Sequence, residues 1–407
     1  MNKPILPNDV AWILKKLNEN GFEGYIVGGC VRDSIMGIAP HDWDMATSAT
    51  PQEVKSIFNH TVDTGIKHGT VTVVLNGENY EITTYRVEGD YKDCRHPSQV
   101  SFTRDLHEDL LRRDFTMNAI AYCQSEGYVD IFGGIDDIER GVIRGVGDAS
   151  ERFREDALRM LRAIRFSVQL DFDIEEKTKE ALGQNTVLIE KISVERIREE
   201  LTKTIMGNAL DRLPVLWETG LLKHISFDIC ESVEKNSEKI INQLKGIEKN
   251  TAMAYAVFLQ FIDSEKTKKV LQRLKFDTKT MRLAETILKD IKIQIETNPA
   301  KVRKLASKIG TEALEALYKV RLAGGESEAE KALENLKIIV ENGDCISVKG
   351  LALSGDDLLI LGVQKGKAMG NILNEILDMV LENPQMNNKE NLLEFVGETL
   401  IKTNEKN

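Results

Sequence analysis

The chain has 407 residues, of which 42% are hydrophobic and 29% are charged, with 8 prolines. This composition excludes a disordered or collagen-like chain, and the length predicts several domains. The formal net charge of −11 means that any nucleic acid would have to bind a local basic surface. The sequence has no apolar run long enough for a membrane helix, no secretory cleavage site and no CxxC pair among its five cysteines. We therefore expect a multidomain cytoplasmic protein without membrane association.

Strand patterns are confined to the first 147 residues, where β-rich runs occur at 25–29, 70–75, 80–87 and 128–134. After residue 150 the helical period takes over and proline is rare. The sequence therefore predicts an α+β protein with an N-terminal α/β head followed by all-α regions. We predict a head at 1–147 and helical neck, body and tail regions at 148–210, 211–300 and 301–407.

A glycine pair follows the first predicted strand, in the segment GGCVRD that starts at Gly28. Two glycines between a strand and a helix allow backbone N–H groups to approach a phosphate, and a helix N-terminus favours negative charge. A simple tight turn explains the pair equally well. The spacing matches neither the dinucleotide-binding fingerprint nor the P-loop.

Two aspartates, Asp42 and Asp44, lie in the segment HDWD. If this segment is a strand, both carboxylates point to the same face and repel each other unless a cation lies between them. Mg²⁺ is the natural cation, because it prefers carboxylate and phosphate oxygens. An exposed turn with solvated acids is the alternative, which the upstream glycine pair makes less favourable. Glu81, in the predicted strand at 80–87, is a candidate third acid.

Two further segments are rich in arginine. In LLRRDFTMNAIAY, Arg112 and Arg113 precede an apolar run, and paired guanidinium groups suit a triphosphate. The second segment places a charged residue at every third position, as Asp156, Arg159, Arg162 and Arg165.

We expect the second segment to be one helix. Ion pairs four residues apart, Arg152 with Asp156 and Glu155 with Arg159, would explain its first turns. They would leave Arg162 and Arg165 without partners at that spacing. A carboxylate and a guanidinium could instead read the edge of a base that carries an exocyclic amine, as cytosine and adenine do.

The motifs GGxxRD, DWD, RRDFTMNA and EDALRMLRAIRF occur in this order and resemble the class II nucleotidyltransferases. This family contains CCA-adding tRNA nucleotidyltransferases and bacterial poly(A) polymerases. The resemblance implies a nucleotidyltransferase head, Mg²⁺ as cofactor, and addition of C, C and A to tRNA from CTP and ATP with release of pyrophosphate. Its partners would be the 3′ end and the elbow of tRNA, with no obligate protein partner.

The resemblance also implies roles for particular residues. The catalytic, metal-binding pair would be Asp42 and Asp44. The nucleotide would be contacted by Gly29, Arg32, Arg113, Asp156, Arg159, Arg162 and Arg165. Of these, Asp156 and Arg159 match the pair that selects the base.

Alternatives within and outside the family stay open at this point. Residues 88–98 lie where CCA-adding and A-adding members carry a loop, so a CC-only enzyme is disfavoured while A-only addition is not excluded. A pI near 5.3 disfavours a poly(A) polymerase. A non-catalytic RNA-binding relative should have lost some of the motifs.

In the predicted tail, the lysines of GVQKGKAMG, Lys365 and Lys367, could face a phosphate backbone or form an ordinary helix–turn–helix joint.

Overall fold

The computed structural model describes residues 3–89 and 99–404. The chain divides into two compact units, residues 1–235 and 236–407. Strands occur in the first unit, and helices make up the rest of the described chain, which confirms the predicted α+β class. The finer division into head, neck, body and tail stays a prediction. Within the described residues, no helix has the length and apolar character needed to cross a membrane.

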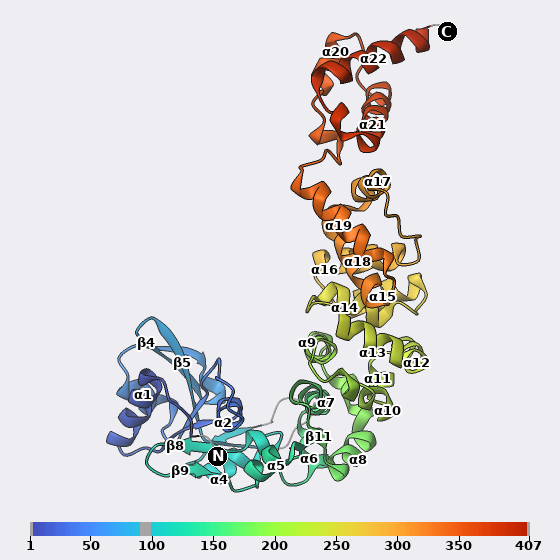
Figure 1. Cartoon of the computed structure of the whole chain (residues 1–407). Helices are drawn as coiled ribbons and strands as arrows, with labels where there is room; N and C mark the ends of the chain where they lie inside the picture. Colours follow the sequence, from blue (N-terminus) through green and yellow to red (C-terminus); the bar gives the residue numbers. More distant parts are fainter. Residues whose placement is uncertain (1–2, 90–98, 405–407) are drawn as a thin grey trace. The chain divides into compact units, whose positions relative to one another are not determined.

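A seven-stranded mixed sheet forms the N-terminal part of the first unit (Figure 1). Its strands are β1 (Gly24–Val27), β2 (Met45–Thr47), β3 (Thr61–Gly65), β4 (Thr70–Leu75), β5 (Glu78–Thr84), β8 (Ala121–Cys123) and β9 (Gly127–Val129). Their spatial order is β3-β4-β5-β2-β1-β8-β9. The β2–β5 pair is parallel and the other neighbours are antiparallel. The interior strand β1 is buried along its whole length, so the glycine turn that follows it starts from a fixed position.

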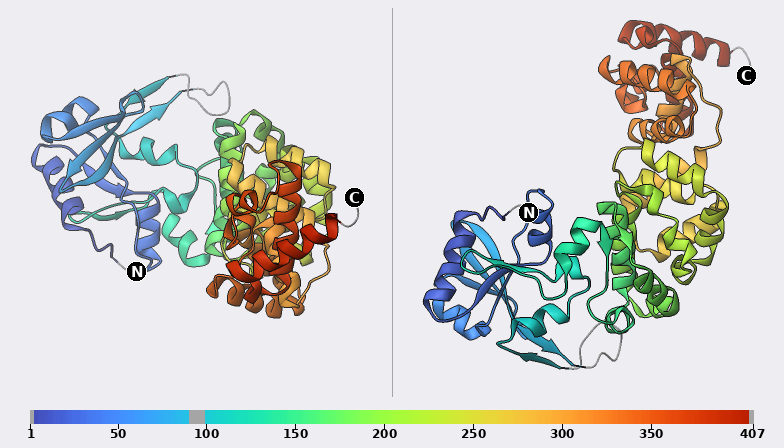
Figure 2. Two further views of the ribbon diagram at one scale, coloured as in Figure 1. Left: turned by 90° about the horizontal axis from the view of Figure 1, so that it is seen from above. Right: turned by 60° about the horizontal axis from the view of Figure 1, so that its bottom comes forward.

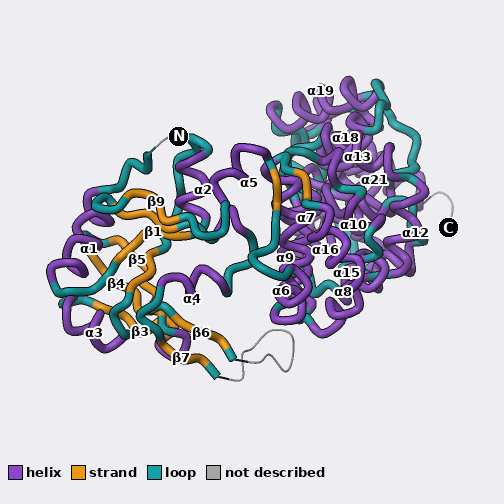
Figure 3. The backbone as a smooth tube through the Cα atoms, turned by 90° about the horizontal axis from the view of Figure 1, so that it is seen from below, coloured by secondary structure: helices purple, strands orange, loops and turns teal. Residues whose placement is uncertain are grey.

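Two small sheets accompany the main one. β6 (Arg86–Glu88) and β7 (Val100–Phe102) are antiparallel and lie beside the main sheet in Figure 3, while β10 (Val142–Ile143) and β11 (Asp173–Ile174) are parallel. The predicted strand at 80–87 is therefore divided between β5 and β6. The predicted strand at 128–134 ends at Val129, because Asp130 accepts hydrogen bonds from the backbone of the next helix.

The helices of the first unit pack around the sheet and then form a helical layer of their own. They are α1 (Asn8–Glu19), α2 (Gly29–Ile35), α3 (Pro51–Ile57), α4 (Leu106–Leu111), α5 (Gly134–Arg140), α6 (Ala149–Glu155), α7 (Leu158–Leu170), α8 (Glu176–Asn185), α9 (Val194–Ile205), α10 (Val215–Glu218), α11 (Leu221–Ile225) and α12 (Phe227–Lys235). Single 3₁₀ turns are η1 (Ile66–His68), η2 (Thr116–Asn118), η3 (Thr186–Lys191) and η4 (Leu210–Arg212).

Side-chain packing joins the sheet region to helix α7. Phe115, which precedes η2, is fully buried, and its ring meets the edge of Phe166 on α7 at a centroid distance of 5.9 Å. Such edge-to-face pairs stabilise by about 1 kcal/mol beyond the area that they bury. Helix α7 packs in turn against α9. These contacts fix both arginine-rich segments relative to the sheet.

The second unit is helical throughout its described part. It contains α13 (Ser237–Gly246), α14 (Thr251–Leu259), α15 (Ser264–Arg273), α16 (Thr278–Asp290), α17 (Pro299–Ile309), α18 (Thr311–Ala323), α19 (Glu328–Glu341), η5 (Val348–Gly350), α20 (Gly355–Ile360), α21 (Lys367–Glu382), η6 (Pro384–Met386) and α22 (Lys389–Asn404). Helix α18 contacts α13, α14 and α16, and α17 contacts α21. In the right view of Figure 2 the orange helices of this region lie between the yellow and the red ones. A separate apolar cluster that includes Leu358, Ile376 and Leu392 holds α20–α22 together.

Candidate active site

A cleft of about 660 Å³ lies in the first unit, between the sheet region and helices α7 and α9. It is lined by Gly28, Gly29, Arg32, Asp42, Asp44, Arg112, Arg113, Asp114, Asn118, Asp156, Leu158, Arg159, Arg162, Arg165, Phe166 and Arg196. The cavity therefore brings together the predicted site residues, except the candidate third acid Glu81. Seven of the lining residues are arginines and four are aspartates, so the cleft is locally basic in an acidic chain.

The glycine turn joins β1 to α2 at the edge of this cleft. Gly28 has φ +77° and ψ −134°, a backbone conformation that essentially only glycine adopts. A Cβ atom at this position would lie 3.2 Å from Nη1 of Arg113. The missing side chain therefore leaves room for the arginine and exposes the backbone to whatever occupies the cleft.

Arg32, on α2, is buried beneath the turn. It donates to Oδ1 of Asn118 at 2.8 Å and to Oδ1 of Asp33 at 2.7 Å. Its guanidinium also lies 5.1 Å from the ring centroid of Phe166. These contacts link α2 to η2 and α7, so Arg32 connects three walls of the cleft.

Asp42 and Asp44 lie immediately before β2, which starts at Met45. The structure therefore places them just before the start of a strand and not within one. The amide of Val27 on β1 nevertheless donates to the Asp44 carbonyl at 3.0 Å, so Asp44 is already fixed beside β1. Desolvation in the cleft raises the pKa of the Asp44 carboxyl, Arg113 opposes this, and the charge of Asp42 raises it further. Neither carboxylate forms a hydrogen bond or salt bridge with another residue in the described part of the chain. Two adjacent carboxylates with unused oxygens are the donor set of a hard divalent cation.

Arg113 is aimed into the cleft by a buried acid that the sequence did not single out. Asp109, on α4, is fully buried and accepts from Nη2 of Arg113 at 3.1 Å and from Nη2 of Arg112 at 2.6 Å. Burial alone would raise the pKa of Asp109, but the two arginines lower it below its usual value. The carboxylate therefore stays charged and holds both guanidinium groups in place.

Asp114 is the centre of a second buried network. Its Oδ2 accepts from Nε and Nη2 of Arg162 at 2.8 and 2.6 Å, and its Oδ1 accepts from Nδ2 of Asn118 at 3.1 Å. Burial opposes ionisation of this carboxyl, but Arg162 and Asn118 outweigh it and lower the pKa of Asp114 to about 2. Arg162 has no acidic residue at helical spacing in the sequence, and it pairs instead with Asp114, which lies 48 positions earlier.

This network predicts a pH dependence of stability. Folding lowers the pKa of Asp114, so on acidification the unfolded chain takes up the proton before the folded chain does. The ionised carboxylate therefore stabilises the folded state above about pH 4, and this stabilisation is lost as the pH falls through 2. Between pH 5 and pH 3 the free energy of unfolding should fall by about 1 kcal/mol from this group. Urea unfolding of the wild type and of Asp114→Asn at both pH values measures this, and the variant should show a flatter pH dependence. An equal change in the free energy of unfolding between the two pH values in both proteins would contradict this prediction.

Asp156 and Arg159 do not share one continuous helix, so the predicted helix was wrong at its start. Helix α6 ends at Glu155, Asp156 is extended with φ −134° and ψ 102°, and α7 begins at Leu158. The Asp156 carboxylate accepts from the Leu158 amide at 3.0 Å, which caps the new helix. The interruption presents Asp156 to the cleft.

Arg159 is held by neighbours on two segments. It pairs with Glu155 at 2.5 Å, as the four-residue spacing predicted, and donates from Nη2 to the Arg112 carbonyl at 2.7 Å. Arg152 pairs with Glu155 at 2.5 Å, so the alternative pairing with Asp156 was wrong. This bond places Arg159 next to Arg112 and Arg113.

Arg165 also has a distant partner. It donates from Nε to Oε2 of Glu200 on α9 at 2.6 Å and lies 4.0 Å from the ring centroid of Phe166. The ring of Phe166 is thus in contact range of Arg165, Arg162 and Arg32. The sequence did not indicate Glu200, since partners 35 residues apart give no periodic signal. Phe166 ends the motif EDALRMLRAIRF, but the sequence indicated no role for it.

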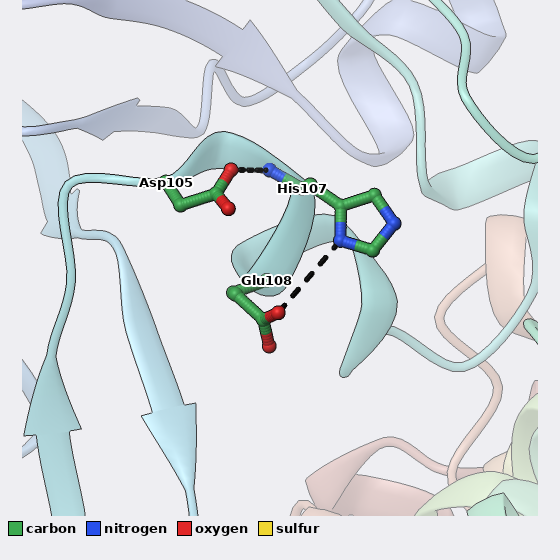
Figure 4. Close-up of side chains that lie close together, drawn as sticks. All are labelled: Asp105, His107 and Glu108. Atoms are coloured by element: carbon green, nitrogen blue, oxygen red, sulfur yellow. Dashed lines mark hydrogen bonds and ion pairs between the residues drawn. The ribbon is translucent and has the colours of Figure 1, made fainter.

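Other acidic groups lie outside this cleft. Glu81, on β5 opposite Thr72, is exposed and does not line it. Asp105, His107 and Glu108 lie close together at the start of α4 (Figure 4). There Asp105 caps the helix by accepting from the His107 amide at 2.9 Å, and His107 lies 3.9 Å from Glu108, so local helix geometry accounts for the cluster. Residues 90–98 of the predicted loop lie outside the described part of the chain.

Comparisons with known proteins cover most of the chain. Residues 24–144 match the poly A polymerase head domain, 171–227 match a probable RNA and SrmB-binding site of polymerase A, and 247–396 match a tRNA nucleotidyltransferase domain 2. The CCA-adding enzyme of Limosilactobacillus fermentum is 38% identical over 403 residues, which cover 95% of this chain and 96% of that protein. The chain belongs to the CCA-adding enzyme family.

Solved structures agree with this family membership. A CCA-adding enzyme of Bacillus stearothermophilus in complex with CTP matches with a TM-score of 0.84 and 32% identity, covering 100% of both chains. A CCA-adding enzyme in complex with ATP matches with a TM-score of 0.68 and 26% identity, over 98% of this chain and 95% of that one. The family and the nucleotidyltransferase fold expected from the motifs are therefore confirmed.

Proposed function

We propose that this protein adds C, C and A to the 3′ end of tRNA, using CTP and ATP and releasing pyrophosphate. The observation that carries the proposal is the cleft itself. It unites the glycine turn, the two unpartnered aspartates, the arginines and the Asp156–Arg159 pair. Full-length similarity to CCA-adding enzymes supports the same activity.

The family as a whole uses a divalent metal, and the residues present fit one. We propose that Asp42 and Asp44 hold Mg²⁺, since their carboxylate oxygens have no other described partner. Bound there, the ion would lower the pKa of the attacking 3′-hydroxyl and stabilise charge on the triphosphate. Burial and the charge of Asp42 raise the pKa of the Asp44 carboxyl, and a bound cation would lower it again.

We further propose that the head residues bind and orient the triphosphate. Gly29 lines the cleft at the start of α2, where the helix dipole favours negative charge. The guanidinium of Arg113 supplies donors from a fixed position, since Asp109 anchors its Nη2. Arg32, Arg162 and Arg165 are each paired with other side chains, so they shape and charge the cleft wall.

Base selection is assigned to Asp156 and Arg159. Asp156 can accept from the exocyclic amine of cytosine or adenine, and Arg159 can donate to a ring nitrogen or carbonyl. Uracil and guanine lack the amine at the equivalent position and would leave a carboxylate unpaired.

The tail segment around Lys365 and Lys367, exposed at the start of α21, is proposed to contact the tRNA backbone. A cytoplasmic location is likewise proposed, from the cysteine pattern.

The test uses purified protein, Mg²⁺, each labelled nucleotide and three tRNA transcripts, which end at the discriminator base, in C and in CC. Addition of C to the first two, of A to the third, and then arrest is the expected result. Addition of A on the CC-ending transcript alone would identify an A-adding enzyme, and long A tails on any RNA a poly(A) polymerase. Binding of tRNA without incorporation would contradict catalysis.

A further inference from the structure

Arg196, on α9, lines the cleft and contacts the residue assigned to base selection. Its Nη2 donates to Oδ2 of Asp156 at 2.8 Å, and its Nη1 lies 3.4 Å from Oδ1. The two side chains are 26% and 20% exposed, so the pair lies at the cleft surface and remains within reach of a ligand. Helix α9 thereby reaches across to the break between α6 and α7.

The hydrogen bonds of Asp156 leave its carboxylate with limited free capacity. An ionised carboxylate has about four acceptor positions, two on each oxygen. Oδ1 accepts from the Leu158 amide at 3.0 Å and faces Nη1 of Arg196, while Oδ2 accepts from Nη2 of Arg196. In the described structure the remaining position is therefore on Oδ2, where a single N–H of an incoming base can bind.

Arg196 also constrains how Asp156 can turn. Asp156 is a single extended residue between two helices, so its backbone alone does not hold the carboxylate plane. A two-point contact with a planar guanidinium does hold it. A carboxylate that was free to rotate would no longer present its open acceptor position to the exocyclic amine of cytosine or adenine.

We propose that Arg196 is a positioning residue that sets base selectivity through Asp156. It fixes the plane of the carboxylate and leaves one acceptor position for an exocyclic amine. This rests on the proposed function, because it specifies how the same cleft distinguishes CTP and ATP from UTP and GTP. Arg196 itself does not touch the reacting atoms in this arrangement.

The test compares Arg196→Met, Arg196→Lys and the wild type, with Lys203→Met as a control. Lys203 is exposed on the same helix and outside the cleft lining, so its substitution removes one positive charge without altering Asp156. The kcat/KM ratios for CTP over UTP and for ATP over GTP are measured on transcripts that end at the discriminator base and in CC. Thermal unfolding of each variant is measured in parallel.

Arg196→Met should lower both discrimination ratios by about tenfold to a hundredfold, the range that one good two-point contact to a base provides. Arg196→Lys should restore part of the ratio, since one charged donor remains, and Lys203→Met should leave it unchanged. An equal loss for all four nucleotides, or unchanged discrimination in a folded Arg196→Met protein, would overturn the proposal. Failure of the wild type to incorporate CTP and ATP would instead refute the proposed function.

Discussion

Replacing Asp44 with asparagine should slow nucleotide transfer by about 10³-fold or more, and Asp42→Asn should do the same. Asparagine keeps the shape of the side chain but removes the charge that a divalent cation requires, and metal stabilisation of phosphoryl transfer amounts to several kcal/mol. The double variant should be little worse than either single one, because the two carboxylates act as a unit. Single-turnover addition of labelled C to a tRNA transcript lacking CCA measures the rate.

The control for these variants is Asp63→Asn, which removes a carboxylate from an exposed surface pair with Lys55 in the same sheet region. It should transfer at the wild-type rate. Binding of tRNA, measured by filter retention, should be nearly unchanged in all of the variants. A near-normal rate in Asp42→Asn or Asp44→Asn would refute the assignment of the metal site, whereas joint loss of transfer, tRNA binding and thermal stability would indicate misfolding.

Removing the guanidinium of Arg159 should relax nucleotide choice more than it weakens triphosphate binding. In Arg159→Ala the base loses its donor, while Arg113 and the glycine turn still hold the phosphates. We expect the preference for CTP over UTP to fall by about a hundredfold, with a much smaller change in KM for CTP. Competition assays with labelled CTP and UTP on the transcript that ends at the discriminator base provide both values.

Arg154→Ala is the matched control for this variant. Arg154 is exposed on α6, five residues upstream, and does not line the cleft. Its substitution removes the same charge from the same segment and should preserve the CTP preference. Unchanged selectivity in a folded Arg159→Ala protein would refute its role in reading the base, and a large rise in KM without loss of selectivity would assign it to the phosphates instead.

Local patterns in the sequence were enough to predict several features of the fold and of the site. The strand at 70–75 and the turn at Gly28 follow from alternation and from glycine chemistry, and the structure has them where the sequence predicted. The candidate site residues all came from short motifs whose members lie close together in the chain, and they line a single cleft. Their chemical roles remain proposals.

What the sequence did not reveal depends on contacts between distant segments. Asp109, Glu200 and Arg196 support the site from elements that show only ordinary helical periodicity. The interruption at Asp156 was missed because Glu155, Asp156 and Ala157 are all compatible with a continuous helix. Tertiary contacts, among them the pairing of Asp156 with Arg196, accompany the break and override local propensity.

The pairing of Asp114 with Arg162 has a consequence for dissecting the molecule. A fragment that stops at residue 147 would retain the sheet and the Asp114 carboxylate but lose the guanidinium of Arg162, and Phe115 would lose the ring of Phe166. A charged hydrogen bond and an edge-to-face ring pair each stabilise by about 1 to 3 kcal/mol, a sizeable part of the stability of a small domain. We therefore expect Asp42 and Asp44 to belong to a cooperative folding unit that extends beyond the sheet, because α7 supplies both the guanidinium that pairs with Asp114 and the ring that packs on Phe115.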